Sequence, residues 1–208
     1  MKQIDRGEVL GLADYEAIRE RFRGRVIAEK KLRRVSVGPY ASAVFENRDT
    51  VLLQIQEMLR TERITRAQAI QHEIDTYNEQ IPGDDELSIT LMIEIEDHAE
   101  REAFLQAAVG FENHVWLVAG TERVQAHGPA RGGEASERTT AVHYLKFALL
   151  GEIAAGLRGA VATRDALGLA LEIDHPAYAA RATLTRETLA SLAEDCGDNV
   201  STASVNER

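Results

Sequence analysis

The side chains with the clearest capacity for chemistry gather between residues 46 and 96. His72 and Asp75 are three residues apart on a predicted helix, so they project from the same face. Glu57 lies about as far before the predicted turn near Arg63 as His72 lies after it. Carboxylates and an imidazole that converge between antiparallel helices are typical of metal sites in helical bundles. The spacing therefore predicts a candidate site between two helices.

Glu94 adds a carboxylate from the strand predicted over 87–95, where it shares one face with Glu96. If the helices cover that face, Glu94 joins Glu57, His72 and Asp75 in a ligand set that suits iron, manganese or zinc. The alternative is that all these side chains line solvated surfaces. The sequence contains neither HExxH nor a repeated Glu-x-x-His pair, so the metal prediction depends on spacing alone.

Aromatic and polar residues beside this set indicate a pocket. Tyr77 and Asn78 lie on or next to the buried stripe of a predicted helix, and Trp116 follows His114 on one side of a predicted strand. We expect Tyr77 and Trp116 to form the walls of a pocket that binds a cofactor or other small molecule. A buried Asn78 must be hydrogen-bonded, either within the fold or within the site. His175 precedes a proline, which favours a hydrogen bond in a turn.

Several function classes find no support in the sequence. No serine lies in G-x-S-x-G, and neither G-x-G-x-x-G nor a Walker-type loop occurs. The net charge of −10 argues against nucleic acid as the main partner. The single cysteine, Cys196, excludes a disulfide framework within the chain and favours a cytoplasmic location. We see no secretory signal, and no apolar run is long enough to predict a membrane span.

Two predicted helices, over 49–63 and 65–80, form the centre of the expected fold, because the short connection between them favours an antiparallel hairpin. The remaining predicted strands are 40–45, 114–119, 123–127, 140–149, 167–173 and 180–184, and the remaining predicted helices are 14–34, 97–109, 151–157 and 185–194. This irregular alternation predicts an α+β fold in which the hairpin and further helices pack on a mixed or mostly antiparallel sheet.

The chain length fits one domain, which we place at 1–196. Residues 197–208 carry too little apolar content to fold, so we expect a disordered tail. The glycine-rich segment 128–137 is expected to be a surface loop. The helix over 14–34 is strongly basic on its outer side, which indicates either a solvated face or a dock for acidic groups of this chain or of a partner.

Five segments of the sequence together resemble an uncharacterised bacterial family, domain of unknown function 3501. They are ENRDTVLLQIQEMLRTER, IQHEIDTYNEQIP, ELSITLMIEIED, NHVWLVAG and DHPAY, and the resemblance covers roughly residues 3–195. Genes of that family often lie near rubrerythrin-like and iron–sulfur oxidoreductase genes, so the resemblance implies a link to redox or oxidative-stress biology. It carries over no catalytic residues.

Three functions remain open on this basis. The first is a metal-binding or redox-associated protein, enzymatic or not, that uses Glu57, His72, Asp75 and Glu94. The second is a non-catalytic partner or scaffold of an iron–sulfur or rubrerythrin-type redox system, docking through the basic helix. The third is a small-molecule binding module with a pocket between the hairpin and the sheet.

Overall fold

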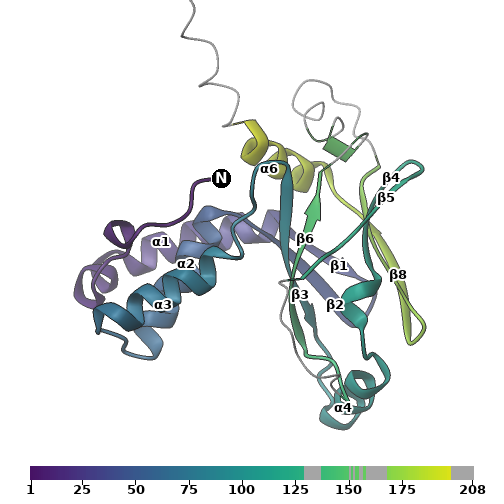
Figure 1. Ribbon diagram of the computed structural model, residues 1–208, viewed down its shortest axis with the longest axis horizontal. Coiled ribbons are helices and arrows are strands. Elements are labelled where there is room, and N and C mark those ends of the chain that lie inside the picture. The colour runs from purple at the N-terminus through teal and green to yellow at the C-terminus, as the bar shows by residue number, and fades with distance from the viewer. Residues whose placement is uncertain (129–136, 150, 152, 155–156, 158–167, 198–208) are drawn as a thin grey trace, which may run out of the picture.

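The protein has an α+β fold of two antiparallel four-stranded sheets and a layer of helices, which confirms the predicted class (Figure 1). The computed structural model describes residues 1–128, 137–149, 151, 153–154, 157 and 168–197. The predicted tail after 197, residues 129–136 of the predicted loop 128–137 and residues 152, 155 and 156 of the predicted helix 151–157 lie outside these residues. Within the described part, no helix is long and apolar enough to cross a membrane.

The first sheet has the strand order β1-β2-β3-β6. Its strands are β1 (Arg34–Val37), β2 (Ala41–Glu46), β3 (Glu86–Ile93) and β6 (Val142–Ala148). Alternation along these strands separates two faces. Phe45, Ile89 and Leu145 lie side by side in the register and are buried in the core, whereas Ser88 pairs with Lys146 on the opposite face. That opposite face is the one available to the helices.

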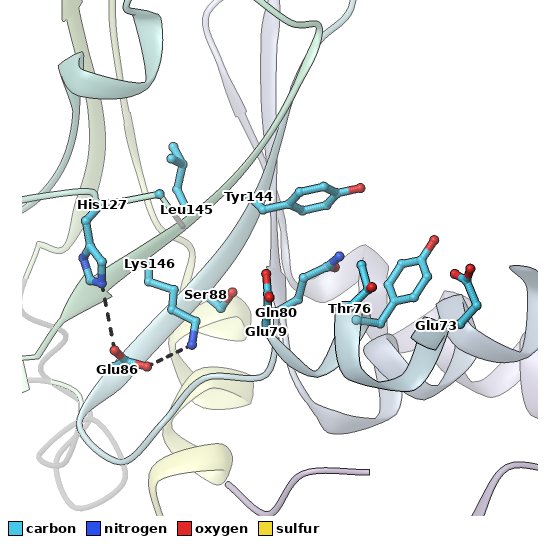
Figure 2. A pocket seen from close by; sticks show the side chains of 12 residues that line it. Glu73, Thr76, Glu79, Gln80, Glu86, Ser88, His127, Tyr144, Leu145 and Lys146 are labelled. Carbon is cyan, nitrogen blue, oxygen red and sulfur yellow. Dashed lines mark hydrogen bonds and ion pairs between the residues drawn. The ribbon is translucent and has the colours of Figure 1, made fainter. Parts of the chain in front are cut away.

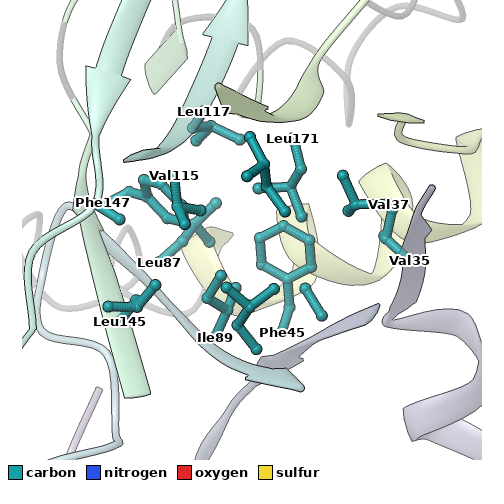
Figure 3. Packing of buried hydrophobic residues seen from close by; sticks show 14 of the residues in the cluster. Val35, Val37, Phe45, Leu87, Ile89, Val115, Leu117, Leu145, Phe147 and Leu171 are labelled. Atoms are coloured by element: carbon teal, nitrogen blue, oxygen red, sulfur yellow. The ribbon is translucent and has the colours of Figure 1, made fainter. Parts of the chain in front are cut away.

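The second sheet, with the order β5-β4-β7-β8, closes the core from the other side. Its strands are β4 (Val115–Ala119), β5 (Glu122–Gln125), β7 (Ala170–His175) and β8 (Tyr178–Thr183). Leucine, isoleucine, valine and phenylalanine side chains of both sheets meet in one cluster (Figure 3). The sheet edges also approach each other, since β1 lies beside β8 and an isolated bridge joins His127 to Lys146. The sequence predicted one sheet and the structure has two, because short strands do not reveal their non-local partners.

The predicted helical hairpin is confirmed as α2 (Arg48–Thr61) and α3 (Ala67–Asn78), which pack on each other and, with α1 (Leu12–Leu32), project to one side of the sheets (Figure 1). The Asn47 side chain caps α2 by accepting the Thr50 backbone N–H at 3.0 Å. A second apolar cluster fills this layer: Ile4, Val9, Val51, Ile55, Leu59, Ile70, Ile74 and Ile81. Asn78 is buried and hydrogen-bonds the backbone of Ile4 in both directions, so its role is structural.

The basic helix ends earlier than predicted. Helix α1 stops at Leu32, and residues 34–37 form β1, because Val35 and Val37 alternate into the core between the sheets. The expectation that this helix docks on acidic groups of the same chain is confirmed. Its ion pairs join Arg19 to Glu57, Arg25 to Asp49 and Lys30 to Glu46.

Two further helices cap the sheets. Helix α4 (His98–Ala107) and helix α6 (Arg186–Gly197) lie at opposite ends of the strands (Figure 1). Asp97 caps α4 through the backbone N–H of Glu100, as its position before the helix indicates. Short 3₁₀ turns precede α1, at Arg6–Glu8, and β4, at Phe111–His114.

Candidate functional site

The four predicted metal ligands are not gathered at one point. Glu57 accepts hydrogen bonds from Arg19 Nε and Nη2, both at 2.8 Å, and from the Tyr15 hydroxyl at 2.6 Å. The bond to Arg19 is the main cause that holds the pKa of Glu57 below its ordinary value. The carboxylate therefore fastens α2 to α1.

Of the other three, two lie on α3 and the third follows β3. His72 and Asp75 are exposed on α3, where Asp75 accepts a hydrogen bond from Gln71 at 2.8 Å. Glu94 accepts from Ser42 at 2.5 Å and from Arg34 at 2.6 Å. Among the residues that the structure describes, no three His, Cys, Asp or Glu side chains lie close enough to hold a metal ion.

A cleft of about 760 Å³ lies where the end of α3 meets the outer face of β3 and β6 (Figure 2). This is the junction of hairpin and sheet at which a pocket was expected, and Tyr77 lines it. Trp116 does not. The other lining residues are Glu73, Thr76, Glu79, Gln80, Glu86, Ser88, His127, Gly128, Tyr144, Leu145 and Lys146.

Gln80 is the most unusual residue of this cleft. Its side chain is buried, with 6% of the residue exposed, yet its Oε1 accepts no hydrogen bond from any described residue. One other buried side-chain oxygen of the described chain shares this property, Oε2 of Glu46. Glu46 is compensated, because the Lys30 ammonium lies 3.5 Å from that oxygen and Thr90 donates to its other oxygen. Gln80 has no such compensation, and leaving an amide oxygen unpaired costs about 1–3 kcal/mol.

Lys146, Glu86 and His127 form a connected group at the sheet end of the cleft (Figure 2). The Lys146 ammonium donates to Glu86 at 3.2 Å and to the Ile81 carbonyl at 3.0 Å, and His127 Nε2 lies 4.0 Å from Glu86. Burial alone would raise the pKa of Glu86, but hydrogen bonds from the Gly83 N–H and Lys146 lower it overall. The group therefore holds an ionised carboxylate beside a neutralising ammonium.

The helix end of the cleft carries carboxylates and phenols. Glu73 and Glu79 make no hydrogen bond or ion pair with the described residues through their carboxylates. Tyr77 and Tyr144 are half-buried there. Burial, with Tyr144 and Glu73 nearby, raises the pKa of Tyr77, so its phenol stays neutral. This end offers hydrogen-bond acceptors and aromatic surface.

Trp116 belongs to a different cluster, on the outer face of the second sheet. Its indole N–H donates to Asp174 at 2.9 Å, and the Arg123 guanidinium lies 4.1 Å from its ring centroid. His114 also contacts Asp174, at 3.1 Å, so His114 and Trp116 share a side as expected. His175 accepts the Ala177 N–H, which confirms its predicted turn hydrogen bond.

Asp174 should make the fold sensitive to acid. Arg123 first, then Trp116 and His114, lower the pKa of Asp174 from its ordinary value of 3.8 to about 2. A carboxyl whose pKa is lower in the folded state contributes stability above its unfolded pKa and loses that contribution as pH falls from about 4 to about 2. Between pH 5 and pH 2, we expect the free energy of unfolding to fall less in Asp174→Asn than in the unsubstituted protein. Denaturant titrations at a series of pH values measure this difference. Parallel curves would refute this assignment.

Tyr77 is the one lining residue of the cleft that was predicted from the sequence as a pocket wall, and most of the polar lining residues were not predicted. Tyr144 and Lys146 could have been found, because they alternate with the core residues Leu145 and Phe147 along β6 and so share the face that Ser88 occupies. Gln80 lies after the end of α3 and gives no periodic signal.

The comparisons with known proteins give a family and a structural relative. A crystal structure described as a novel protein of unknown function from Burkholderia pseudomallei K96243 is similar, with 35% sequence identity and a TM-score of 0.85. The match covers 93% of this chain and 99% of that one. No match was found among curated proteins. The model of the protein family of unknown function DUF3501 matches residues 3–196, nearly all of the part that carries the two sheets, the hairpin and the cleft, and the chain belongs to that family.

Proposed function

We propose that this protein binds a small polar organic molecule in the cleft between α3 and the outer face of β3 and β6. The observation that carries the proposal is that Gln80, a residue that lines the cleft, has a buried Oε1 without a hydrogen-bond partner among the described residues. A buried amide oxygen without a donor is unfavourable for folding alone, and a ligand N–H or O–H would satisfy it.

The dimensions and chemistry of the cleft support the same function. Its volume of about 760 Å³ falls within the range of about 300–1,000 Å³ that is typical of ligand sites. Tyr77 and Tyr144 supply apolar surface, while Gln80 and Ser88 supply polar groups that could orient a ligand. A few convergent polar groups on a mainly apolar wall are typical of binding sites.

The test compares Gln80→Met with the unsubstituted protein. Methionine has a similar shape and no unpaired amide, so the variant without ligand should be more stable by about 1–3 kcal/mol in denaturant unfolding. The same variant should lose binding. In a thermal-shift screen of soluble amines, amino acids, carboxylic acids and sugars, at least one compound should stabilise the unsubstituted protein and not Gln80→Met. A ligand at one hundred times its Kd contributes about 2.7 kcal/mol, which is readily measured.

Gln68→Met is the matched control, because Gln68 is exposed on α3 and does not line the cleft. It should change neither stability nor the screen. A Gln80→Met variant that unfolds more easily than the unsubstituted protein would show that Gln80 is a structural residue, and a hit that survives the substitution would place binding elsewhere.

The metal-binding or redox-associated function and the redox protein partner stay predictions. The hydrogen bonds of Glu57 and Glu94 to arginines explain those carboxylates without a metal. The cleft has the more direct structural support, so the small-molecule function is preferred.

A further inference from the structure

We infer that the ligand of the cleft is an organic cation, an ammonium or guanidinium group attached to an apolar or aromatic body. This inference rests on the proposed binding function and specifies the chemical class of its ligand.

The charges that line the cleft favour a cation. The cleft is lined by three carboxylates, those of Glu73, Glu79 and Glu86, and by one ammonium, that of Lys146. Glu86 is shared between Lys146 and His127, whereas Glu73 and Glu79 lack hydrogen bonds and ion pairs with the described residues. The charge that is not neutralised within the cleft is therefore negative, and it lies at the helix end.

Several acceptors that belong to the cleft residues have no donor among the described residues. Oε1 of Gln80 is an acceptor, and so are the carboxylates of Glu73 and Glu79. A group that can donate several hydrogen bonds at once, such as an ammonium with three N–H or a guanidinium with five, matches such acceptors. A carboxylate ligand carries no donor for Oε1 of Gln80 and would be repelled by the carboxylates of Glu73 and Glu79.

Lys146 does not reverse this preference. Its ammonium already donates to the Ile81 carbonyl at 3.0 Å and to Glu86 at 3.2 Å. An anion would have to compete with both contacts, and weakening them would expose Glu86 to the same anion. The Lys146 ammonium is therefore already engaged at the sheet end of the cleft and offers little attraction to an anionic ligand.

The aromatic residues fit the body of such a ligand. Tyr77 and Tyr144 both line the cleft and lie close enough for Tyr144 to raise the pKa of Tyr77, as burial and Glu73 also do. The rings of these tyrosines offer electron-rich faces that attract cations.

Benzylamine, benzyl alcohol and benzoate test the inference, because the three probes share one aromatic body and differ in charge. Titrations of the full chain by calorimetry or by NMR chemical shifts should show benzylamine binding at least tenfold more tightly than the alcohol or benzoate. The double variant Glu73→Gln/Glu79→Gln should weaken benzylamine at least tenfold and leave benzyl alcohol unchanged. Glu62→Gln, an exposed carboxylate beyond α2 and outside the cleft, should have no effect.

The outcomes separate the ligand class from the binding function. Tighter binding of benzoate or benzyl alcohol, lost in Gln80→Met, would overturn the cationic class and leave binding in the cleft intact. Equal affinity of benzylamine for the unsubstituted protein and the double carboxylate variant would also overturn it. If no amine of the broader screen binds while other compounds do, the cationic class fails. If no compound of any class binds, the proposed function fails with it.

Discussion

Replacing Asp195 with alanine is expected to lower the free energy of unfolding by about 3–5 kcal/mol, because the buried Arg33 loses its hydrogen-bonded carboxylate and keeps only Glu29, 3.9 Å away. Arg33 is 1% exposed and its Nη2 donates to the Asp195 carboxylate of α6. The rest of the guanidinium is also engaged. Nε donates to the Phe45 carbonyl at 2.9 Å and Nη1 to Ser191 Oγ at 3.0 Å.

The position of Arg33 explains why the effect should be large. The residue lies between α1 and β1, and its contacts join these elements to β2 and α6. Loss of Asp195 therefore weakens the attachment of the last helix. Urea denaturation followed by circular dichroism measures the change.

Glu194→Ala supplies the matched control, since Glu194 is the exposed neighbour of Asp195 on α6. Its effect should stay within about 0.5 kcal/mol, as expected for a surface site. An Asp195→Ala variant no less stable than Glu194→Ala would contradict the buried ion pair. The combined Arg33→Met/Asp195→Leu variant should lose less than Asp195→Ala, because no uncompensated charge stays buried.

The elements that were predicted well have strong local periodicity. The hairpin carries apolar residues such as Ile55 and Leu59 on α2 and Ile70 and Ile74 on α3 at helical spacing, and all four are buried. Along the eight residues of β3, Leu and Ile alternate with mostly polar residues in the sequence. Strand β1 was missed because its four residues directly follow the basic helical run, and because the burial of Val35 depends on strands distant in the sequence.

The predicted metal set shows the limit of spacing arguments. Glu57 and His72 are about equally far from the turn along the sequence, which predicted that they lie near each other. The orientation of each helix about its own axis, however, decides where each side chain points. Glu57 faces α1, where Arg19 and Tyr15 bind it, and His72 faces solvent. The sequence shows that α1 is basic, but not which of its arginines meets which carboxylate.

The polar residues of the cleft could not be predicted from the sequence, for a different reason. Gln80 is notable only because it is buried without a partner, and burial of a residue after a helix end depends on what the sheet places above it. Lys146 could be assigned to a face of β6 from alternation, but its contact with Glu86 requires the pairing of β3 with β6. Such contacts follow from the fold and cannot be read from local patterns.

Replacing Gly38 with alanine is expected to destabilise the protein by about 2–4 kcal/mol. Gly38 lies in the turn between β1 and β2. Its φ of +73° is a conformation that residues with a Cβ rarely adopt. An added Cβ would also collide with the Tyr178 hydroxyl and lie 2.9 Å from the Ala180 Cβ.

Tyr178 cannot move aside without loss. Its hydroxyl donates to the Val37 carbonyl at 2.5 Å and accepts the Tyr40 N–H at 3.1 Å, so it ties β8 to the turn of the other sheet. Its ring also packs against Tyr40 and Phe104, with centroids 5.9 and 5.6 Å away. The collision therefore strains the joint between the sheets as well as the turn. Thermal and urea unfolding of Gly38→Ala measure the sum of these effects.

Gly24→Ala is the control for the loss of a glycine itself. Gly24 is exposed within α1, and an added Cβ would meet nothing within 4 Å, so alanine should stabilise the protein by up to about 1 kcal/mol. Opposite signs for the two substitutions would separate the geometry at Gly38 from the general effect of glycine replacement. A Gly38→Ala variant as stable as the unsubstituted protein would contradict the close approach of Tyr178.

The double variant Gly38→Ala/Tyr178→Phe distinguishes the two causes of strain at this joint. Removing the hydroxyl relieves its collision with the new Cβ, but leaves the positive φ and the contact with Ala180. Tyr178→Phe alone loses the hydrogen bonds to Val37 and Tyr40. If the collision matters, the double variant should be more stable than the sum of the two single losses predicts, by about 0.5–3 kcal/mol of coupling. Strict additivity would assign the effect of Gly38→Ala to the backbone conformation and the contact with Ala180, because only residues in contact are expected to couple.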